Sequence, residues 1–255
     1  MTERTHVPVY LDPYTRSADH LDLLSAGPWQ HMAPTVSAAL AGIGETEATI
    51  VELGSGTGLG TGVIAHAAPN AQIVAVEPSG HLRAVLLHRV ASDNDLRSRV
   101  TVENRPFPSS RLPEKFDALV MINSLGHLDP DERSELWRVV ATGLLPGGHA
   151  VINLQAPTTS SAVPEFEMAR ERVGNREYHG TASAERVDER TMIWHMTYRT
   201  SEDGHEIDAT EVEYRWNVLD ADTLDTELAR HGLHAGAVGD EQLGVFRVEQ
   251  DARRR

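Results

Sequence analysis

The chain has 255 residues, enough for one large domain with a sizeable core or for one domain with a lid. It has no cysteine, which excludes disulfides, thiolate metal sites and cysteine nucleophiles. Its formal net charge is -15 and Lys115 is its only lysine. This balance argues against a nucleic-acid substrate, because binding nucleic acid requires cationic side chains that neutralise phosphates.

The sequence also bears on location and on metal binding. No apolar run approaches the length of a membrane span, and the first residues lack the apolar core of a signal peptide, so we expect a cytoplasmic protein with no membrane partner. Thirteen histidines raise the question of a metal site. No H-x-x-x-H pair occurs, and His81 and His88 are seven residues apart, whereas a helical metal pair needs a spacing of three or four. We therefore expect no required metal.

The first 48 residues are expected to form an arm followed by helices. Residues 1–17 contain Pro8 and Pro13 and indicate an extended arm. Residues 18–26 and 29–42 place apolar residues at helical spacing, and Gly27 and Pro28 between them predict a break into two short helices.

The next stretch, residues 49–62, has the pattern of a nucleotide-binding corner. A buried strand leads into the glycine turn at 54–58, and a helical pattern follows. Glycines let the backbone approach a ligand, and the helix N-terminus offers unpaired N–H groups. No lysine follows the glycines, which excludes a P-loop, and G-x-G-x-x-G fails in every register because Leu59, Thr61 and Val63 are not glycine.

Strands and helices continue to alternate up to residue 154. Strands are predicted at 72–76, 99–103, 116–122 and 150–154. Ser79 is expected to cap a helix after the second strand, and Asp129 and Pro130 have the chemistry of another helix start. Such repeats predict an α/β fold, a doubly wound and mostly parallel sheet whose ligands bind beyond the carboxyl ends of the strands.

The last hundred residues are predicted to add a lid and to complete the sheet. Residues 155–190 are polar and irregular, with a helix expected through Phe166, Met168 and Val173. Two β-rich runs, 191–198 and 207–216, flank an Asp-Gly turn signal and predict an antiparallel hairpin. A helix ending at Gly232 and strands at 234–238 and 243–248 follow. We thus expect one domain over 1–255, with a core at 49–154, an insertion at 155–218, final elements at 219–250 and a tail at 251–255.

Four segments together resemble the class I S-adenosylmethionine-dependent methyltransferases. They are E-L-G-S-G-T-G at 52–58, the strand at 72–76 that ends in Glu77, F-D-A-L-V-M-I at 116–122 and L-L-P-G-G at 144–148. The resemblance covers roughly residues 49 to 154 and is specific in the combination of motifs, whereas the glycine loop alone is a weak signal. It implies S-adenosyl-L-methionine as cofactor and a seven-stranded Rossmann-like methyltransferase fold with an N-terminal helical cap.

The resemblance also implies a set of cofactor-binding residues. Glu77 is expected to accept the ribose hydroxyls, and Glu52 to lie near the methionine amino group. The acid that this family usually places near residue 106 is missing from N-R-P-F at 104–107, so Phe107 is a candidate for packing on the purine or in the core. The expected cofactor-binding residues are Glu52, Gly54, Ser55, Gly56, Gly58, Glu77, Pro78, Pro106, Phe107 and Asn123.

His127 is the first candidate for a catalytic group. It follows the strand at 116–122 by a few residues, so we expect it at the rim of the crevice, and an imidazole with an ordinary pKa of about 6.5 is available as a base at neutral pH. The alternative is that it packs or caps beside Asp129. Tyr14 and His31 are the other candidates, since the arm and the N-terminal helices of this family often lie over the cofactor. Tyr10 and Trp29 are pocket candidates for the same reason.

We therefore expect methyl transfer to a small-molecule acceptor, a metabolite or a natural product, by a monomer or homodimer. Three alternatives remain open at this point. The protein binds the cofactor for regulation without transferring a group, or it uses the cofactor electrostatically for rearrangement or cyclisation, or it methylates protein or RNA. The acidic charge and the lack of an appended recognition domain count against the third alternative.

Overall fold

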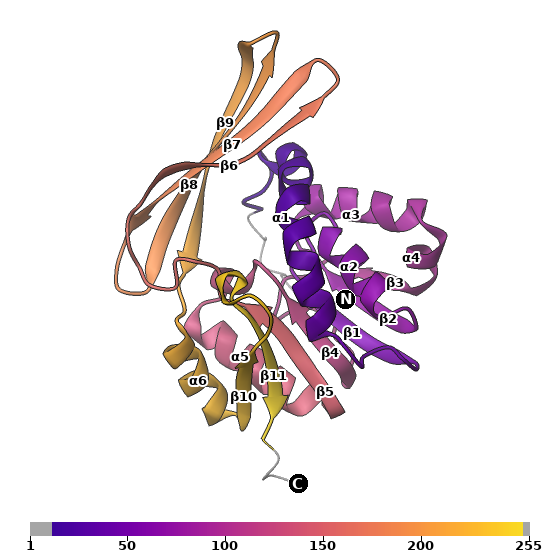
Figure 1. Cartoon of the computed structure of the whole chain (residues 1–255). Coiled ribbons are helices and arrows are strands. Elements are labelled where there is room, and N and C mark those ends of the chain that lie inside the picture. The colour runs from indigo at the N-terminus through magenta and orange to yellow at the C-terminus, as the bar shows by residue number, and fades with distance from the viewer. Residues whose placement is uncertain (1–11, 252–255) are drawn as a thin grey trace, which may run out of the picture.

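The central sheet has seven strands, and the computed structural model describes residues 12–251 (Figure 1). Its strands are β1 (Ala48–Leu53), β2 (Ala71–Val76), β3 (Val100–Glu103), β4 (Phe116–Met121), β5 (Leu144–Asn153), β10 (Leu233–Ala237) and β11 (Val245–Gln250). They lie in the order β10-β11-β5-β4-β1-β2-β3. The first five pair in parallel, and β11 is antiparallel to both β5 and β10. The predicted doubly wound, mostly parallel sheet is confirmed.

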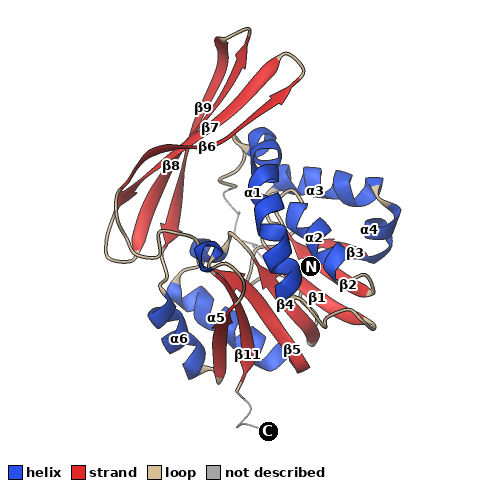
Figure 2. Ribbon diagram, in the orientation of Figure 1, coloured by secondary structure: helices blue, strands red, loops and turns tan. Residues whose placement is uncertain are grey.

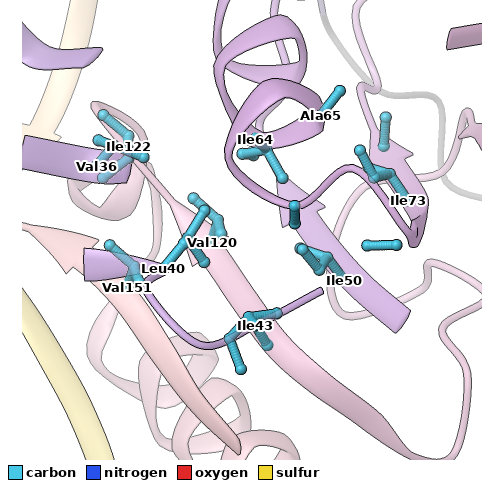
Figure 3. Packing of buried hydrophobic residues seen from close by; sticks show 14 of the residues in the cluster. Val36, Leu40, Ile43, Ile50, Ile64, Ala65, Ile73, Val120, Ile122 and Val151 are labelled. Atoms are coloured by element: carbon cyan, nitrogen blue, oxygen red, sulfur yellow. The ribbon is translucent and has the colours of Figure 1, made fainter. Parts of the chain in front are cut away.

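Helices cover both faces of this sheet (Figure 2). They are α1 (Ala18–Ala39), α2 (Leu59–Ala67), α3 (Gly80–Ser92), α4 (Asn94–Arg99), α5 (Pro130–Gly143) and α6 (Ala221–Arg230), with short 3-10 turns η1 (Leu125–His127) and η2 (Glu241–Leu243). On one face Val36 of α1 and Ile64 of α2 belong to one core cluster with Ile50 of β1 (Figure 3). On the other face Leu136 and Leu224 belong to a second core cluster. Burial on both faces explains why the parallel strands are nearly continuous apolar runs.

Two predicted helix starts have the expected caps. The Ser79 hydroxyl accepts a hydrogen bond from the Leu82 N–H at 3.2 Å at the start of α3. Asp129 forms a capping box with Glu132 at the start of α5, and Pro130 occupies the first turn. Both caps satisfy N–H groups that the helix itself leaves without partners.

The N-terminal helix is continuous, so the predicted break into two helices is wrong. Gly27 and Pro28 lie inside α1, which runs from Ala18 to Ala39. An interior proline removes one helical hydrogen bond. Here the buried residues Leu24 and Met32 lie on either side of Gly27 and Pro28 and pack the helix against the protein. This burial outweighs the local preference of Gly-Pro to end a helix.

The insertion is a separate antiparallel sheet of four strands rather than a lid followed by one hairpin. It consists of β6 (Val163–Val173), β7 (Arg176–Arg186), β8 (Thr191–Glu202) and β9 (His205–Asn217), in that order. The β8–β9 hairpin and its Asp203-Gly204 turn are as predicted, with both residues at positive φ. The helix expected through Phe166 and Met168 is wrong, because this segment is β6 and its backbone groups pair with β7. We call β6–β9 the second sheet.

The second sheet rests on the N-terminal helix and on the loop after β4. The buried His20 of α1 lies with its Nε2 3.2 Å from the Thr200 Oγ1, and Leu24 lies against Gly180 of β7. At its other end the Asn217 side chain donates to the carbonyls of Gly126 and Leu128, both at 3.2 Å. These contacts place one end of the second sheet beside the carboxyl end of β4. Within residues 12–251 no helix is long and apolar enough to cross a membrane.

Candidate active site

The glycine turn after β1 contains three glycines whose backbone is left-handed, and their surroundings differ. Gly54, Gly56 and Gly58 have φ of 75°, 56° and 89°. A Cβ on Gly54 would lie 2.7 Å from the Ser124 side chain, and one on Gly58 would lie 2.7 Å from Leu86, so these two glycines permit close packing. A Cβ on Gly56 would meet no atom within 4 Å. The backbone at Gly56 is therefore open to a ligand.

The turn is held by the end of β2. The N–H groups of Gly54 and Ser55 both donate to the carbonyl of Val76 at 3.0 Å. Ser55 is buried, and its hydroxyl donates to the Glu52 carbonyl at 3.4 Å. The turn is thus fixed by backbone bonds before any ligand binds, which lowers the entropy that a ligand would have to overcome.

Glu52, at the end of β1, is a buried carboxylate. The Thr61 hydroxyl donates to its Oε2 at 2.5 Å, and a Cβ on Gly60 would lie 2.7 Å from both its Oε1 and the Trp29 ring. Burial raises the pKa of Glu52 to about 7, against the hydrogen bonds from Thr61 and Ser55 that lower it. A cationic ligand group beside it would favour the ionised form.

Glu77, just beyond β2, already holds two backbone N–H groups. Its Oε2 accepts from Gly56 at 2.7 Å and its Oε1 accepts from Ser79 at 2.7 Å. Burial raises the pKa of Glu77 to about 7, although these two bonds act in the opposite direction. Each carboxylate oxygen keeps a second lone pair, so the group can still accept two further hydrogen bonds.

The raised pKa of Glu52 makes the ligand-free protein sensitive to pH. Its folded-state pKa lies above the ordinary value of about 4.5, so its contribution to stability is fully present below pH 4.5 and is lost as the pH rises through about 7. Glu52→Gln, which keeps an acceptor for Thr61, is expected to raise the free energy of unfolding at pH 8 by roughly 1–3 kcal/mol and to change it little at pH 4.5. Urea unfolding between pH 4.5 and 8 measures this. Glu45→Gln, at an exposed acid, is the matched control, and parallel pH curves for Glu52→Gln and wild type would contradict the assignment.

The loop after β4 lies against the glycine turn at the end of β1. Asn123 has a φ of 55°, and its N–H donates to the Asn153 Oδ1 at 2.7 Å while the Asn153 side chain donates back to the Asn123 Oδ1 at 2.8 Å. The Ser124 hydroxyl donates to the Leu53 carbonyl at 3.1 Å. The ends of β1, β4 and β5 are thereby linked, and the exposed Asn123 lies at their common edge.

The residues after β2 and β3 form a half-buried rim. Pro78 follows Glu77, and its carbonyl accepts from Arg83 at 2.9 Å. Pro106 is half-buried, and Phe107 packs against the core cluster that contains Leu53 and Val76. Phe107 thus packs in the core, as one of the two interpretations of this residue expects, and its contact with a purine stays a prediction.

Tyr14 of the arm meets His127 of η1 beyond the carboxyl end of β4. Tyr14 Oη and His127 Nε2 share a hydrogen bond of 2.6 Å. The His127 ring also meets the Trp216 ring edge-on at 5.0 Å, and the Tyr14 ring lies 5.1 Å from that of Tyr214. A Cβ on Gly126 would lie 2.0 Å from the Trp216 indole, so only glycine allows this contact. The arm, η1 and β9 thus build one aromatic wall.

The surroundings of His127 lower the pKa of its imidazole below the ordinary value that we expected. The residue is exposed, yet protein atoms surround the imidazole closely, and this desolvation lowers its pKa to about 4. The ring is therefore neutral at pH 7, and the ordinary value of about 6.5 does not apply. A neutral imidazole can still take a proton, with a weaker driving force.

Two of the remaining candidates lie on α1. His31 is exposed on α1, and Trp29 is half-buried near Gly60 and Glu52. Tyr10 lies outside the described residues. The role of His31 stays a prediction. Within residues 12–251 no three histidine or acidic side chains are placed to share a metal ion.

Sequence reasoning missed two aromatic residues of this wall. Tyr214 and Trp216 alternate with polar residues on β9, a pattern that predicts ordinary packing in a sheet. They do pack in the second sheet, but the same rings touch Tyr14 and His127. The alternation in the sequence shows that the two side chains share one face of a strand, but it does not show which residues that face contacts.

Residues 51–150 match a family model described as a methyltransferase domain, and this segment includes the glycine turn, Glu77, Asn123 and His127. The chain contains a methyltransferase domain. The resemblance seen in the four motifs is confirmed. No curated protein sequence matches the chain significantly.

Solved structures share the fold of this methyltransferase domain and of the parts around it. The DesVI protein of Streptomyces venezuelae has a TM-score of 0.75 and 16% identity, covering 91% of this chain and 98% of its own. An amino pentose methyltransferase of Micromonospora echinaspora, involved in calicheamicin biosynthesis, has a TM-score of 0.69 and 16% identity, with coverage of 96% and 99%. A sugar N-methyltransferase of a Streptoalloteichus species has a TM-score of 0.69 and 17% identity, with coverage of 98% and 99%. At these identities the likeness shows a common fold, and coverages of 91% or more mean that it includes much of the second sheet.

Proposed function

We propose that this methyltransferase domain transfers a methyl group from S-adenosyl-L-methionine to a small-molecule acceptor. The observation that carries the proposal is that the glycine turn, its two buried carboxylates and the Tyr14–His127 pair all lie at the carboxyl ends of the neighbouring strands β1, β2 and β4. Gly54 of the turn packs against Ser124, in the loop that leads to His127. The arm contributes Tyr14, which shares a hydrogen bond with His127. A cofactor corner and an acceptor wall thus face the same space.

The residues at the corner fit this cofactor. The space beside Gly56 admits a ligand against the backbone, where loop N–H groups would face the methionine carboxylate. Glu52 would hold the methionine ammonium, and Glu77 would accept the ribose hydroxyls through its remaining lone pairs. The other proposed contacts come from Pro78, Pro106, Phe107 and Asn123 on the rim.

The chain's own contribution to the reaction is orientation and proton handling. The bound cofactor supplies an activated methyl group on a sulfonium. Tyr14 and His127 would place the acceptor nucleophile, and the surrounding rings of Tyr214 and Trp216 would exclude water. The neutral His127 ring would accept the proton that an oxygen or nitrogen nucleophile loses.

Amino sugars are the proposed first acceptors to test. Two of the similar structures are named as an amino pentose methyltransferase and a sugar N-methyltransferase. The net charge of -15 would attract a cationic amine and repel nucleic acid. We propose that residues 49–154 hold the cofactor, and that the arm and residues 155–218 form the acceptor side, in a cytoplasmic monomer or homodimer.

The test is a screen of amino sugars and pooled metabolites with methyl-labelled cofactor. Label in a small molecule, with release of S-adenosylhomocysteine, is the expected result. Cofactor binding without label in any acceptor would favour a regulatory binding protein or an enzyme that uses the cofactor for rearrangement or cyclisation. Label in protein or RNA would contradict the small-molecule assignment.

Glu77→Ala is expected to weaken S-adenosylhomocysteine binding by about 2–4 kcal/mol, because it removes two hydrogen bonds to a charged group. Calorimetry measures the loss. The variant also leaves the Gly56 and Ser79 N–H groups without their acceptor, so a deoxyribose analogue separates the two effects. The analogue should lose much less affinity in Glu77→Ala than in wild type. Equal losses in both proteins would show that Glu77 does not touch the ribose.

A further inference from the structure

The described part of the arm, residues 12–17, is attached at two points, one beyond the end of β2 and the other beyond the end of β4. At the first point Asp12 meets the start of α3: its Oδ2 accepts from the Ser79 hydroxyl at 2.8 Å and lies 3.1 Å from the His81 Nδ1. At the second point Tyr14 meets His127 of η1 at 2.6 Å. Since α3 follows β2 and η1 follows β4, with β1 between these strands, the arm crosses over the glycine turn of β1.

Asp12 also shapes the arm itself. Its Oδ1 accepts from the Tyr14 N–H at 2.9 Å, and its backbone carbonyl accepts from the Thr15 hydroxyl at 3.1 Å. An aspartate that holds the N–H two residues ahead fixes a tight turn. The position of the Tyr14 ring therefore depends on the Asp12 side chain as well as on Tyr14's own contacts.

The Asp12 carboxylate stands directly beside the proposed ribose site. Ser79 joins the two acids, because its hydroxyl donates to Asp12 while its N–H donates to Glu77 at 2.7 Å. Asp12 is 16% exposed. Burial acts to raise the pKa of Asp12, but the hydrogen bonds that it accepts outweigh burial and hold the pKa below its usual value. The contacts thus favour a charged, firmly bound carboxylate.

We propose that Asp12 is a positioning residue that fastens the arm over the cofactor site and holds Tyr14 against His127. The inference rests on the proposed function. It has two consequences. The cofactor enters and leaves when Asp12 releases Ser79 and His81, so Asp12 sets the rate of cofactor exchange. Turnover also depends on Asp12, because Asp12 fixes the position of the Tyr14 side chain.

The first test uses the ligand-free chain. Arg16 is an exposed arm residue, so trypsin cleavage after Arg16, followed by mass spectrometry, reports how often the arm is released. Asp12→Ala is expected to speed this cleavage about tenfold or more, because hydrogen bonds to a charged group are lost. Asp12→Asn keeps an acceptor for the Tyr14 N–H and should lie between Asp12→Ala and wild type. Glu47→Ala removes an exposed acid elsewhere and should not change the rate.

The second test uses the complex with S-adenosylhomocysteine. Its dissociation, followed by stopped flow, should be about tenfold faster in Asp12→Ala than in wild type. In a Tyr14→Phe background, Asp12→Ala should still speed dissociation but should add little to the loss of turnover. A residue that merely supports the fold would lower turnover further in the Tyr14→Phe background as well.

Unchanged cleavage and dissociation in Asp12→Ala, with wild type binding the ligand, would overturn the inference and leave the proposed function intact. If wild type fails to bind S-adenosylhomocysteine, the proposed function and the cofactor-exchange role are both overturned, and trypsin cleavage still decides whether Asp12 fastens the arm.

Discussion

His127→Ala is expected to lower turnover about 10²–10⁴-fold while leaving the affinity for S-adenosylhomocysteine nearly intact. Its Nε2 lies 2.6 Å from the Tyr14 Oη, and neither residue is among those proposed to hold the cofactor. Because desolvation lowers its pKa to about 4, the neutral form persists down to that pH. Turnover of wild type through this group should therefore fall only as the pH drops toward 4, and the variant should lack this acidic limb.

The controls separate proton transfer from packing. His127→Gln keeps a polar side chain of similar size that cannot act as a base, and it should lose turnover to a comparable extent. Tyr14→Phe removes the hydroxyl and keeps the ring against Tyr214. His88→Ala removes an exposed histidine of α3 and should be neutral. Near-normal turnover in both His127 variants would assign the residue to packing against Trp216.

Gly56→Val is expected to abolish S-adenosylhomocysteine binding measured by calorimetry. The Val side chain would enter the open space beside Gly56, and a β-branched residue is strained at a φ of 56°. The N–H that reaches Glu77 would also be displaced.

A matched variant isolates the effect of position. A Cβ on Gly62, in the first turn of α2, also meets no atom within 4 Å, and its φ is not positive. Gly62→Val should keep binding within about tenfold, because a β-branched residue in a helix costs only a fraction of a kcal/mol. Circular dichroism checks that both variants fold. Unchanged affinity in Gly56→Val would contradict the placement of the ligand, and binding of a nicotinamide dinucleotide by wild type would contradict the choice of cofactor.

The central sheet was predictable because its signals are local. Ser79 and Asp129 each mark a boundary through bonds to their own neighbours in sequence, and the glycines mark a turn through a left-handed backbone that they adopt readily. Parallel strands buried on both faces also leave continuous apolar runs that cannot be mistaken for solvent-facing segments.

The parts that sequence reasoning misplaced depend on distant partners. Pro28 signals a break, and α1 is continuous because Leu24 and Met32 are buried against the rest of the protein. Phe166 carries too little periodic signal among polar residues, and β6 forms because β7 lies beside it. Local propensity is a weak guide wherever tertiary contacts decide the conformation.

The candidate site divides in the same way. Glu52, Glu77 and the glycines follow from motif and order along the chain. The lowered pKa of His127, its bond to Tyr14 and the role of Trp216 arise where the arm, η1 and the second sheet meet. No spacing in the sequence encodes that meeting, because it joins segments more than 80 residues apart.

A crystal structure of the chain with S-adenosylhomocysteine tests the central claim most directly. The account predicts the ribose hydroxyls on Glu77, the methionine end against the backbone at Gly56 and the sulfur facing Tyr14 and His127. A ligand bound elsewhere, or bound with its sulfur turned away from the Tyr14–His127 pair, would contradict it.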